Sequence, residues 1–140
     1  MNDQFLDFIK KRGFISQCTD EENLKKTLST KTSGYIGFDC TSDSLHVGSL
    51  LPLMILKHYQ SFGHTPIVLL GGGTTLIGDP SGKDETRKIL SAEEINSNKK
   101  KLKIVFEKFL SFDSSKKNAA LLVDNYDWLS NLNLIDFLRD

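Results

Sequence analysis

Three short apolar runs, separated by longer segments with helical spacing, constrain the fold of this chain most strongly. The runs are "SGYIGF" at 33–38, "PIVLL" at 66–70 and "NAALLVDN" at 118–125. Their near-continuous apolar character is typical of strands in a parallel sheet that is covered on both faces. Strands that alternate with helices indicate parallel strands joined by right-handed crossovers. The order of the elements therefore predicts an α/β fold.

Two long helices are predicted between these strands. Apolar residues recur at intervals of three and four over 45–62, where Gly63 supplies a stop, and again over about 91–110. Both segments are long enough to cross back over a sheet and cover it. This spacing supports the parallel arrangement of the strands.

Further helices are predicted at the two ends of the chain. The pattern over 3–12 predicts a helix that stops at Gly13, and "TDEE" at 19–22 fits a capping box that opens a short second helix. The segment "LNLIDFLRD" at 132–140 predicts a last helix without a stop signal.

Composition narrows the possible partners and location. The chain has 140 residues, which is enough for one domain. Its 18 basic residues balance its 18 acidic residues, so nucleic acid could contact it only through a local patch. Lysines 99–101 and Lys103 form such a patch, although a solvated helix face is favoured for them. Because no apolar run nears the roughly 18 residues of a membrane span and two cysteines make no disulfide scaffold, we expect a cytoplasmic protein that does not bind a membrane.

Polar residues follow each predicted strand at its carboxyl end. They lie at 39–49, 71–83 and 124–128. Ligands of open parallel sheets bind beyond the carboxyl ends of the strands. We therefore expect these three segments to meet at one edge and form a site.

The glycine-rich segment after the second strand does not fit the common phosphate-binding motifs. A P-loop needs glycine at Ile77, five residues before Gly82, and a hydroxyl residue at Asp84. A dinucleotide fingerprint that starts at Gly71 fails at Leu76. The glycines are as compatible with tight turning and close backbone approach as with ligand binding.

A histidine stands at the start of the helix that follows the first strand. His46 precedes Gly48, and Asp39 and Thr41 lie within eight residues of it, all at the carboxyl end of a strand. A helix start carries free N–H groups and partial positive charge, which suit phosphate oxygens. Capping is the alternative role for a lone histidine there, but the neighbouring polar residues favour a nucleotide site.

Three motifs carry a resemblance to a known family. "YIGFDCTSDSLHVGSLLPL", "GGGTTLIGDPSGKDETR" and "DNYDWL" closely resemble the first half of the catalytic domain of bacterial-type tyrosyl-tRNA synthetases, and "LHVGS" resembles the His-Ile-Gly-His signature of class I enzymes. The resemblance implies a Rossmann-like parallel sheet with flanking helices. Residues 1–32 would then be an amino-terminal helical segment. Residues 33–140 would be the first half of the nucleotide-binding catalytic domain, truncated at the C-terminus.

The resemblance also implies a pocket for L-tyrosine. Tyr35 matches the tyrosine that hydrogen-bonds the phenol of the substrate, and Asp79 matches the carboxylate that holds its ammonium group. Thr74 matches a contact in the same pocket, and Asn125 matches an asparagine that supports it.

For ATP, the resemblance implies a binding set and a catalytic set. The binding set is Gly37, Asp39, Thr41, His46, Gly48 and Ser49. The catalytic set is Thr41, His46, Ser49, Lys83 and Arg87, of which Lys83 and Arg87 match mobile-loop cations that meet the pyrophosphate.

The family's reaction agrees with these residue types. The carboxylate of tyrosine attacks the α-phosphorus of ATP, and the tyrosyl group then moves to tRNA(Tyr), so positioning and charge stabilisation suffice without a protein nucleophile. By resemblance we expect ATP as a substrate with Mg²⁺ on its phosphates, no tightly bound cofactor or metal, and a homodimeric full-length protein. The chain resembles only part of the catalytic domain, so we expect the 140 residues alone to be inactive.

The sequence departs from the family pattern at three positions. Ser49 replaces the second histidine or asparagine of the signature, Ile36 stands where some relatives carry cysteine, and Cys40 replaces the usual proline. Cys40 places a thiol near the ATP site, where an inert thiol is favoured. Two other functions stay open: a nucleotidyltransferase with a related histidine signature, or a nucleotide-binding module without catalysis.

Overall fold

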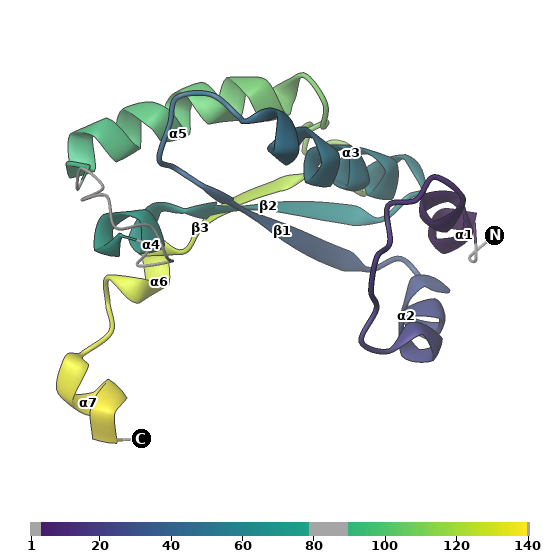
Figure 1. Ribbon diagram of the computed structural model, residues 1–140, viewed down its shortest axis with the longest axis horizontal. Coiled ribbons are helices and arrows are strands. Elements are labelled where there is room, and N and C mark those ends of the chain that lie inside the picture. Colours follow the sequence, from purple (N-terminus) through teal and green to yellow (C-terminus); the bar gives the residue numbers. More distant parts are fainter. Residues whose placement is uncertain (1–3, 79–89, 140) are drawn as a thin grey trace.

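The computed structural model, which describes residues 4–78 and 90–139, contains a three-stranded parallel sheet. The strands β1 (Ser33–Asp39), β2 (Thr65–Gly71) and β3 (Leu121–Asp124) lie side by side in that order (Figure 1). Tyr35 of β1 aligns with Ile67 of β2, which aligns with Leu121 of β3. The predicted α/β fold with a parallel sheet is confirmed.

The third strand is shorter than its apolar run. The backbone of 118–120 is held by a loop instead: Gln60 donates from Nε2 to the carbonyl of Asn118, and the amide of Ala120 donates to the carbonyl of Ser111. These bonds replace strand pairing, so β3 begins only at Leu121.

Helices α3 (Val47–Ser61) and α5 (Ala92–Glu107) cover one face of the sheet (Figure 1). Gly63, at φ +93°, ends α3 as predicted. Ser91 and Glu94 form a capping box that starts α5. The core between these helices and the sheet includes Phe38, Leu53, Leu56, Val68, Leu70, Ile95, Leu102 and Phe106.

In the described residues the sheet is covered on one face only, where the sequence predicted both. Side chains alternate along β1, so that Tyr35 is 69 % exposed while Phe38 is buried. Ile67 and Leu121 share the open face with Tyr35 because they align with it. These residues are apolar, which is why the sequence pattern predicted a covered face.

Helices α1 (Gln4–Lys11) and α2 (Glu21–Leu28) lie at the amino end of the sheet (Figure 1). Gly13, at φ +74°, follows α1 as predicted. The cap of α2 differs from the predicted box: Asp20, rather than Thr19, is the capping residue, and its side chain accepts from the amide of Asn23 at 2.9 Å. The partial positive charge at the start of the helix also stabilises a carboxylate at this position.

Two short helices lie at the carboxyl end of the sheet, α4 (Gly72–Ile77) and α6 (Tyr126–Leu129), and a third, α7 (Leu134–Arg139), lies beyond α6 and away from the sheet (Figure 1). The predicted last helix is confirmed as α7, although it begins two residues later. Helices α4 and α6 have too few turns to show periodicity, and α4 opens on glycines that disfavour helix, so the sequence did not predict them. Within the described ranges, no helix has the length and apolar character to cross a membrane.

Candidate functional site

A pocket of about 310 Å³ lies at the carboxyl end of β1, where the chain turns into α3. Its lining includes all six residues of the predicted ATP-binding set: Gly37, Asp39, Thr41, His46, Gly48 and Ser49. The pocket falls within the size range of small-molecule sites. Ile36, by contrast, packs against the core and is not part of this lining.

His46 caps α3 through its side chain. Its Nδ1 accepts from the amide of Gly48 at 2.9 Å, and its carbonyl accepts from the amide of Ser49 at 2.8 Å. Because Nδ1 acts as an acceptor, the neutral imidazole carries its proton on Nε2. A Cβ at Gly48 would lie 3.1 Å from that Nδ1, so the missing side chain leaves room for the imidazole. The capping alternative and the nucleotide alternative are therefore compatible, since capping uses only one ring nitrogen.

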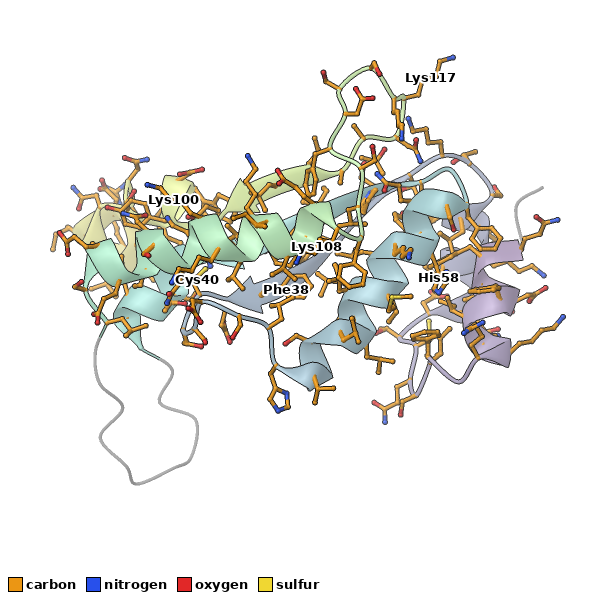
Figure 2. All side chains as sticks on the ribbon, turned by 90° about the horizontal axis from the view of Figure 1, so that it is seen from above. Phe38, Cys40, His58, Lys100, Lys108 and Lys117 are labelled. Carbon is orange, nitrogen blue, oxygen red and sulfur yellow. The ribbon has the colours of Figure 1, made fainter. Side chains whose placement is uncertain are left out.

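The peptide groups of Cys40 are held on both sides. Its amide donates to Oγ of Thr75 at 3.1 Å, and its carbonyl accepts from Nδ2 of Asn98 at 2.9 Å. Figure 2 shows Phe38 and Cys40 on the side of α5 that faces α3, with Lys100 on the opposite side. Burial, and then the charge of Asp124, raise the pKa of the Cys40 thiol to about 11. The thiol is thus protonated and buried, in agreement with the predicted inert cysteine.

Side chains that follow β3 bind the backbone at the start of α4. The amide of Gly72 donates to Oδ1 of Asp124 at 3.1 Å, and the amide of Gly73 donates to Oδ1 of Asn125 at 2.8 Å. A Cβ at Gly72 would lie 2.4 Å from Asp124 Oδ1. The glycines therefore serve close approach between two strand ends, one of the two roles left open by the sequence.

Thr74 joins this arrangement through its side chain. Its Oγ accepts from Nδ2 of Asn125 at 3.2 Å and donates to the carbonyl of Gly71 at 3.2 Å. Asn125 is buried, whereas Thr74 is exposed. Two members of the predicted tyrosine-binding set are thus in direct contact.

An ion pair links α5 to the same strand end. Nζ of Lys99 lies 2.7 Å from Oδ2 of Asp124, and the two side chains are only 21 % and 15 % exposed. The amide of Tyr126 also donates to Asp124, at 3.0 Å. Lys101 pairs with Asp43 at 3.0 Å on the surface, where this bond lowers the pKa of Asp43. Lys99 therefore departs from the solvated helix face that the sequence favoured, whereas Lys100, Lys101 and Lys103 are exposed.

The predicted phenol-binding residue lies away from the pocket at His46. Tyr35 lines a second, apolar pocket of about 240 Å³, together with Leu28 and Tyr59. It shares the open sheet face with Asp39, four residues later, which is about 13 Å along a strand. The structure therefore does not place Tyr35 in the pocket that the ATP-binding set lines.

Three predicted site residues lie outside the described residues: Asp79, Lys83 and Arg87. Over the ranges 4–78 and 90–139, the structure brings together no group of three or more His, Cys, Asp or Glu side chains suited to a metal ion.

Sequence reasoning missed Thr75 and Asn98. It placed Lys99 in a lysine patch and Asp124 in a polar segment without finding that the two form an ion pair. A signal was available for Asn98 and Lys99. Positions 95, 98, 99, 102 and 106 form one stripe of α5, and Ile95, Leu102 and Phe106 in it are buried. Two polar residues within an apolar stripe indicate that polar partners lie beneath it.

The chain is similar to known proteins of one family. The family described as "tRNA synthetases class I (W and Y)" matches residues 26–140. A tyrosine–tRNA ligase of Pelagibacter ubique is 56 % identical over 98 % of this chain and 34 % of the relative. One from Wolbachia pipientis of Culex pipiens is 54 % identical over 98 % of this chain and 33 % of the relative. The chain thus spans about a third of the length of these curated relatives.

A solved structure gives the same result for the fold. A C-terminally truncated mitochondrial tyrosyl-tRNA synthetase of Aspergillus nidulans superposes with a TM-score of 0.78 at 26 % identity, over 96 % of this chain and 41 % of that one. The resemblance drawn from the three motifs is confirmed, and all three of these relatives carry the tyrosine name. The chain belongs to the class I tRNA synthetase family that contains the tryptophan and tyrosine enzymes.

Proposed function

We propose that this chain is the nucleotide-binding part of a tyrosine–tRNA ligase. The full-length protein would convert L-tyrosine and ATP to tyrosyl-adenylate and pyrophosphate, and then transfer the tyrosyl group to tRNA(Tyr). One observation carries the proposal: the six residues of the ATP-binding set surround one pocket at the tip of β1, beside the start of α3. The identity of 54–56 % to proteins named tyrosine–tRNA ligase supports the choice of amino acid.

On the ATP side, His46 supplies a fixed hydrogen-bond donor. Its Nδ1 is bound to the Gly48 amide, so Nε2–H remains for a phosphate oxygen. The imidazole thereby extends the positive end of α3 toward the pocket. A donor that is already oriented stabilises charge on the phosphate without reorganisation during the reaction. Thr41 and Ser49 add hydroxyl groups to the same lining.

On the tyrosine side, Tyr35 would bind the phenol and Asp79 the ammonium group. Thr74 would contact the same ligand, and Asn125 supports it, since its amide bonds to the Thr74 hydroxyl and the Gly73 amide. A site that hydrogen-bonds a phenol rejects phenylalanine strongly, because its polar groups are left without a partner; tyrosine enzymes of this class are themselves the known example of this rule.

The reaction needs positioning more than covalent chemistry. The tyrosine carboxylate attacks the α-phosphorus, the bond to the β-phosphate breaks, and pyrophosphate leaves with the negative charge. Lys83 and Arg87 would meet that charge, as cations that stabilise it during the transfer. Mg²⁺ would enter with ATP, bound to its phosphates as part of the substrate.

We further infer the organisation of the full-length protein. Residues 1–32 would be a helical segment that packs at the amino end of the sheet, and 33–140 the first half of the nucleotide-binding domain. The protein would act as a homodimer in the cytoplasm.

Tyrosine-dependent exchange between ATP and labelled pyrophosphate, measured with the full-length protein, tests the proposal. We expect exchange with tyrosine and almost none with phenylalanine or without an amino acid. Exchange that requires a phosphorylated acceptor would instead establish a nucleotidyltransferase. ATP binding without any tyrosine-dependent exchange would establish a module without catalysis.

A further inference from the structure

Two neighbouring polar residues of α5 lie within its core-facing stripe. Asn98 and Lys99 stand between Ile95 and Leu102, both of which are buried. Placing an amide and an ammonium group there is unfavourable unless each has a partner. Each does have one, and the two partners lie at the carboxyl ends of different strands, β1 and β3.

Asn98 contacts the segment that lines the ATP pocket. Its Nδ2 donates to the carbonyl of Cys40, the residue between Asp39 and Thr41. On the other side of Cys40, Thr75 accepts from its amide. Because Asp39 and Thr41 both line the pocket, these two bonds fix the backbone that carries them.

Lys99 contacts the carboxyl end of β3, which lies on the other side of β2 from β1. It pairs with Asp124, whose carboxylate also accepts from the amides of Gly72 and Tyr126. Since Gly72 begins α4, the ion pair fixes the helix that carries Thr74. The low exposure of both charged side chains makes the pair hard to replace by water.

We propose that Asn98 and Lys99 are positioning residues that set the two sides of the site separately, Asn98 the ATP side and Lys99 the tyrosine side. Consecutive residues of a helix point about 100° apart, so a single turn of α5 reaches both strand ends. The helix thereby fixes the distance between ATP and tyrosine, on which transfer to the α-phosphorus depends. This inference rests on the proposed function.

The ATP side is tested with full-length Asn98→Leu, which removes the bond from α5 to the Cys40 carbonyl. In the exchange assay we expect this variant to raise KM for ATP about 3- to 10-fold, the range that loss of a neutral hydrogen bond gives. KM for tyrosine stays unchanged. Asn96→Leu is the matched control, because Asn96 is exposed on the same helix, and it changes neither constant.

The tyrosine side is tested with Lys99→Met and with the double variant Lys99→Met/Asp124→Asn. The double variant leaves no unpaired charge and keeps an oxygen that can accept from the Gly72 amide, so it folds even if the single variant does not. We expect kcat/KM for tyrosine to fall roughly 10- to 100-fold, the cost of a small misplacement of a reacting group. KM for ATP changes less than twofold, and the control Lys100→Met behaves as wild type.

Unselective results would overturn the inference. If the variants on both sides change the two KM values equally, or change neither, α5 has no separate positioning role. A wild-type protein without tyrosine-dependent exchange would overturn the proposed function together with this inference. An active wild type with unselective variants would overturn this inference alone.

Discussion

The two ring nitrogens of His46 have different surroundings. Nδ1 accepts from the Gly48 amide and so completes the start of α3, whereas Nε2 is the nitrogen that we propose binds a ligand of the adjoining pocket. The capping bond fixes both the tautomer and the direction of the ring. The same bond explains why a glycine follows, since a Cβ at Gly48 would crowd Nδ1 at 3.1 Å.

Substitutions of His46 can separate its role in capping α3 from its proposed role in binding the ligand. We expect His46→Ala to lower kcat of tyrosyl-adenylate formation about 100-fold, as for loss of one oriented donor at a developing charge. It should also lower the free energy of unfolding by about 1 kcal/mol, because the cap is lost. Single-turnover adenylate formation and denaturant unfolding measure the two effects.

His46→Asn is the control for the cap. Asparagine is a good capping residue, so this variant keeps the stability of wild type. It should still lose most of the rate, because its shorter side chain does not reach the ligand. A His46→Asn enzyme with wild-type kcat would contradict the role of Nε2.

At the scale of elements, the start of α4 depends on close contact with the end of β3. The amides of Gly72 and Gly73, after β2, are bound by Asp124 and Asn125 at the end of β3. The amide of Cys40, after β1, is bound by Thr75 of α4. Side-chain bonds to backbone therefore join the ends of all three strands. In this way side chains of the protein satisfy the amides of Gly72, Gly73 and Cys40.

We expect Gly72→Ala to be strongly destabilising. Its Cβ would lie 2.4 Å from Oδ1 of Asp124, so the carboxylate must move and its pairing with Lys99 weakens. The free energy of unfolding should fall by about 1–3 kcal/mol, as for other overpacked sites. Denaturant unfolding of the full-length variant measures this effect.

Gly37→Ala provides the matched comparison. A Cβ at Gly37 would meet nothing within 4 Å, so stability should stay within about 0.5 kcal/mol of wild type. Equal stability of the Gly72 and Gly37 variants would contradict the close packing at α4.

The long elements could be predicted from the sequence because their periodicity spans several turns. The spacing in α3 and α5 and the glycine stop after α3 were all visible. Helix α4 could not be predicted, since six residues beginning with glycines carry no periodic signal. The partners of Asn98 and Lys99 depend on which strands lie beneath α5, and that is a property of the tertiary fold.

The sequence predicted part of the candidate site. The motif around His46 predicted a cluster of polar residues beyond the end of β1, where ligand sites of parallel sheets lie, and these residues do line one pocket there. The distance between Tyr35 and that pocket was not apparent, since a motif gives order along the chain and not separation in space. The roles of all these residues remain predictions.

At the scale of the whole molecule, one face of the sheet stands open in the described residues. Tyr35 and Leu121 are 69 % and 48 % exposed, and Ile67 lies between them in register. Apolar surface of this kind marks a place where other protein packs. The curated relatives are about three times as long as this chain, so they contain further chain that can cover such a face.

We therefore expect the isolated 140-residue chain to self-associate and to make no tyrosyl-adenylate. Sedimentation velocity should show oligomers that Leu121→Lys reduces, because a charge on the open face opposes contact. Ile104→Lys is the control, since Ile104 is exposed on α5 away from that face. A monomeric chain, or one that forms adenylate, would contradict this expectation.

Stability should also depend on pH through two histidines. Burial lowers the pKa of His64 below its ordinary value of 6.5, and burial followed by the charges of Arg12 and Lys57 lowers the pKa of His58. His64 is stacked on Tyr59 at 4.5 Å, and its Nδ1 accepts from the Thr32 amide, so protonation costs that contact.

The direction of this pH dependence follows from how many protons the folded and unfolded states bind. Both histidines take up protons more readily when unfolded, so the free energy of unfolding is highest above pH 6.5 and falls as the pH drops below it. Denaturant unfolding on either side of that pH measures the effect, and His64→Gln should reduce the slope. A free energy of unfolding that rises on acidification would contradict the burial of these groups.

The most direct test of the central claim is a crystal structure of the full-length protein with a non-hydrolysable ATP analogue and tyrosine. We predict phosphate oxygens within hydrogen-bond distance of His46 Nε2, the nucleotide against Asp39 and Gly48, and the substrate phenol at Tyr35. A nucleotide bound elsewhere, with no contact to the pocket at the tip of β1, would contradict the account.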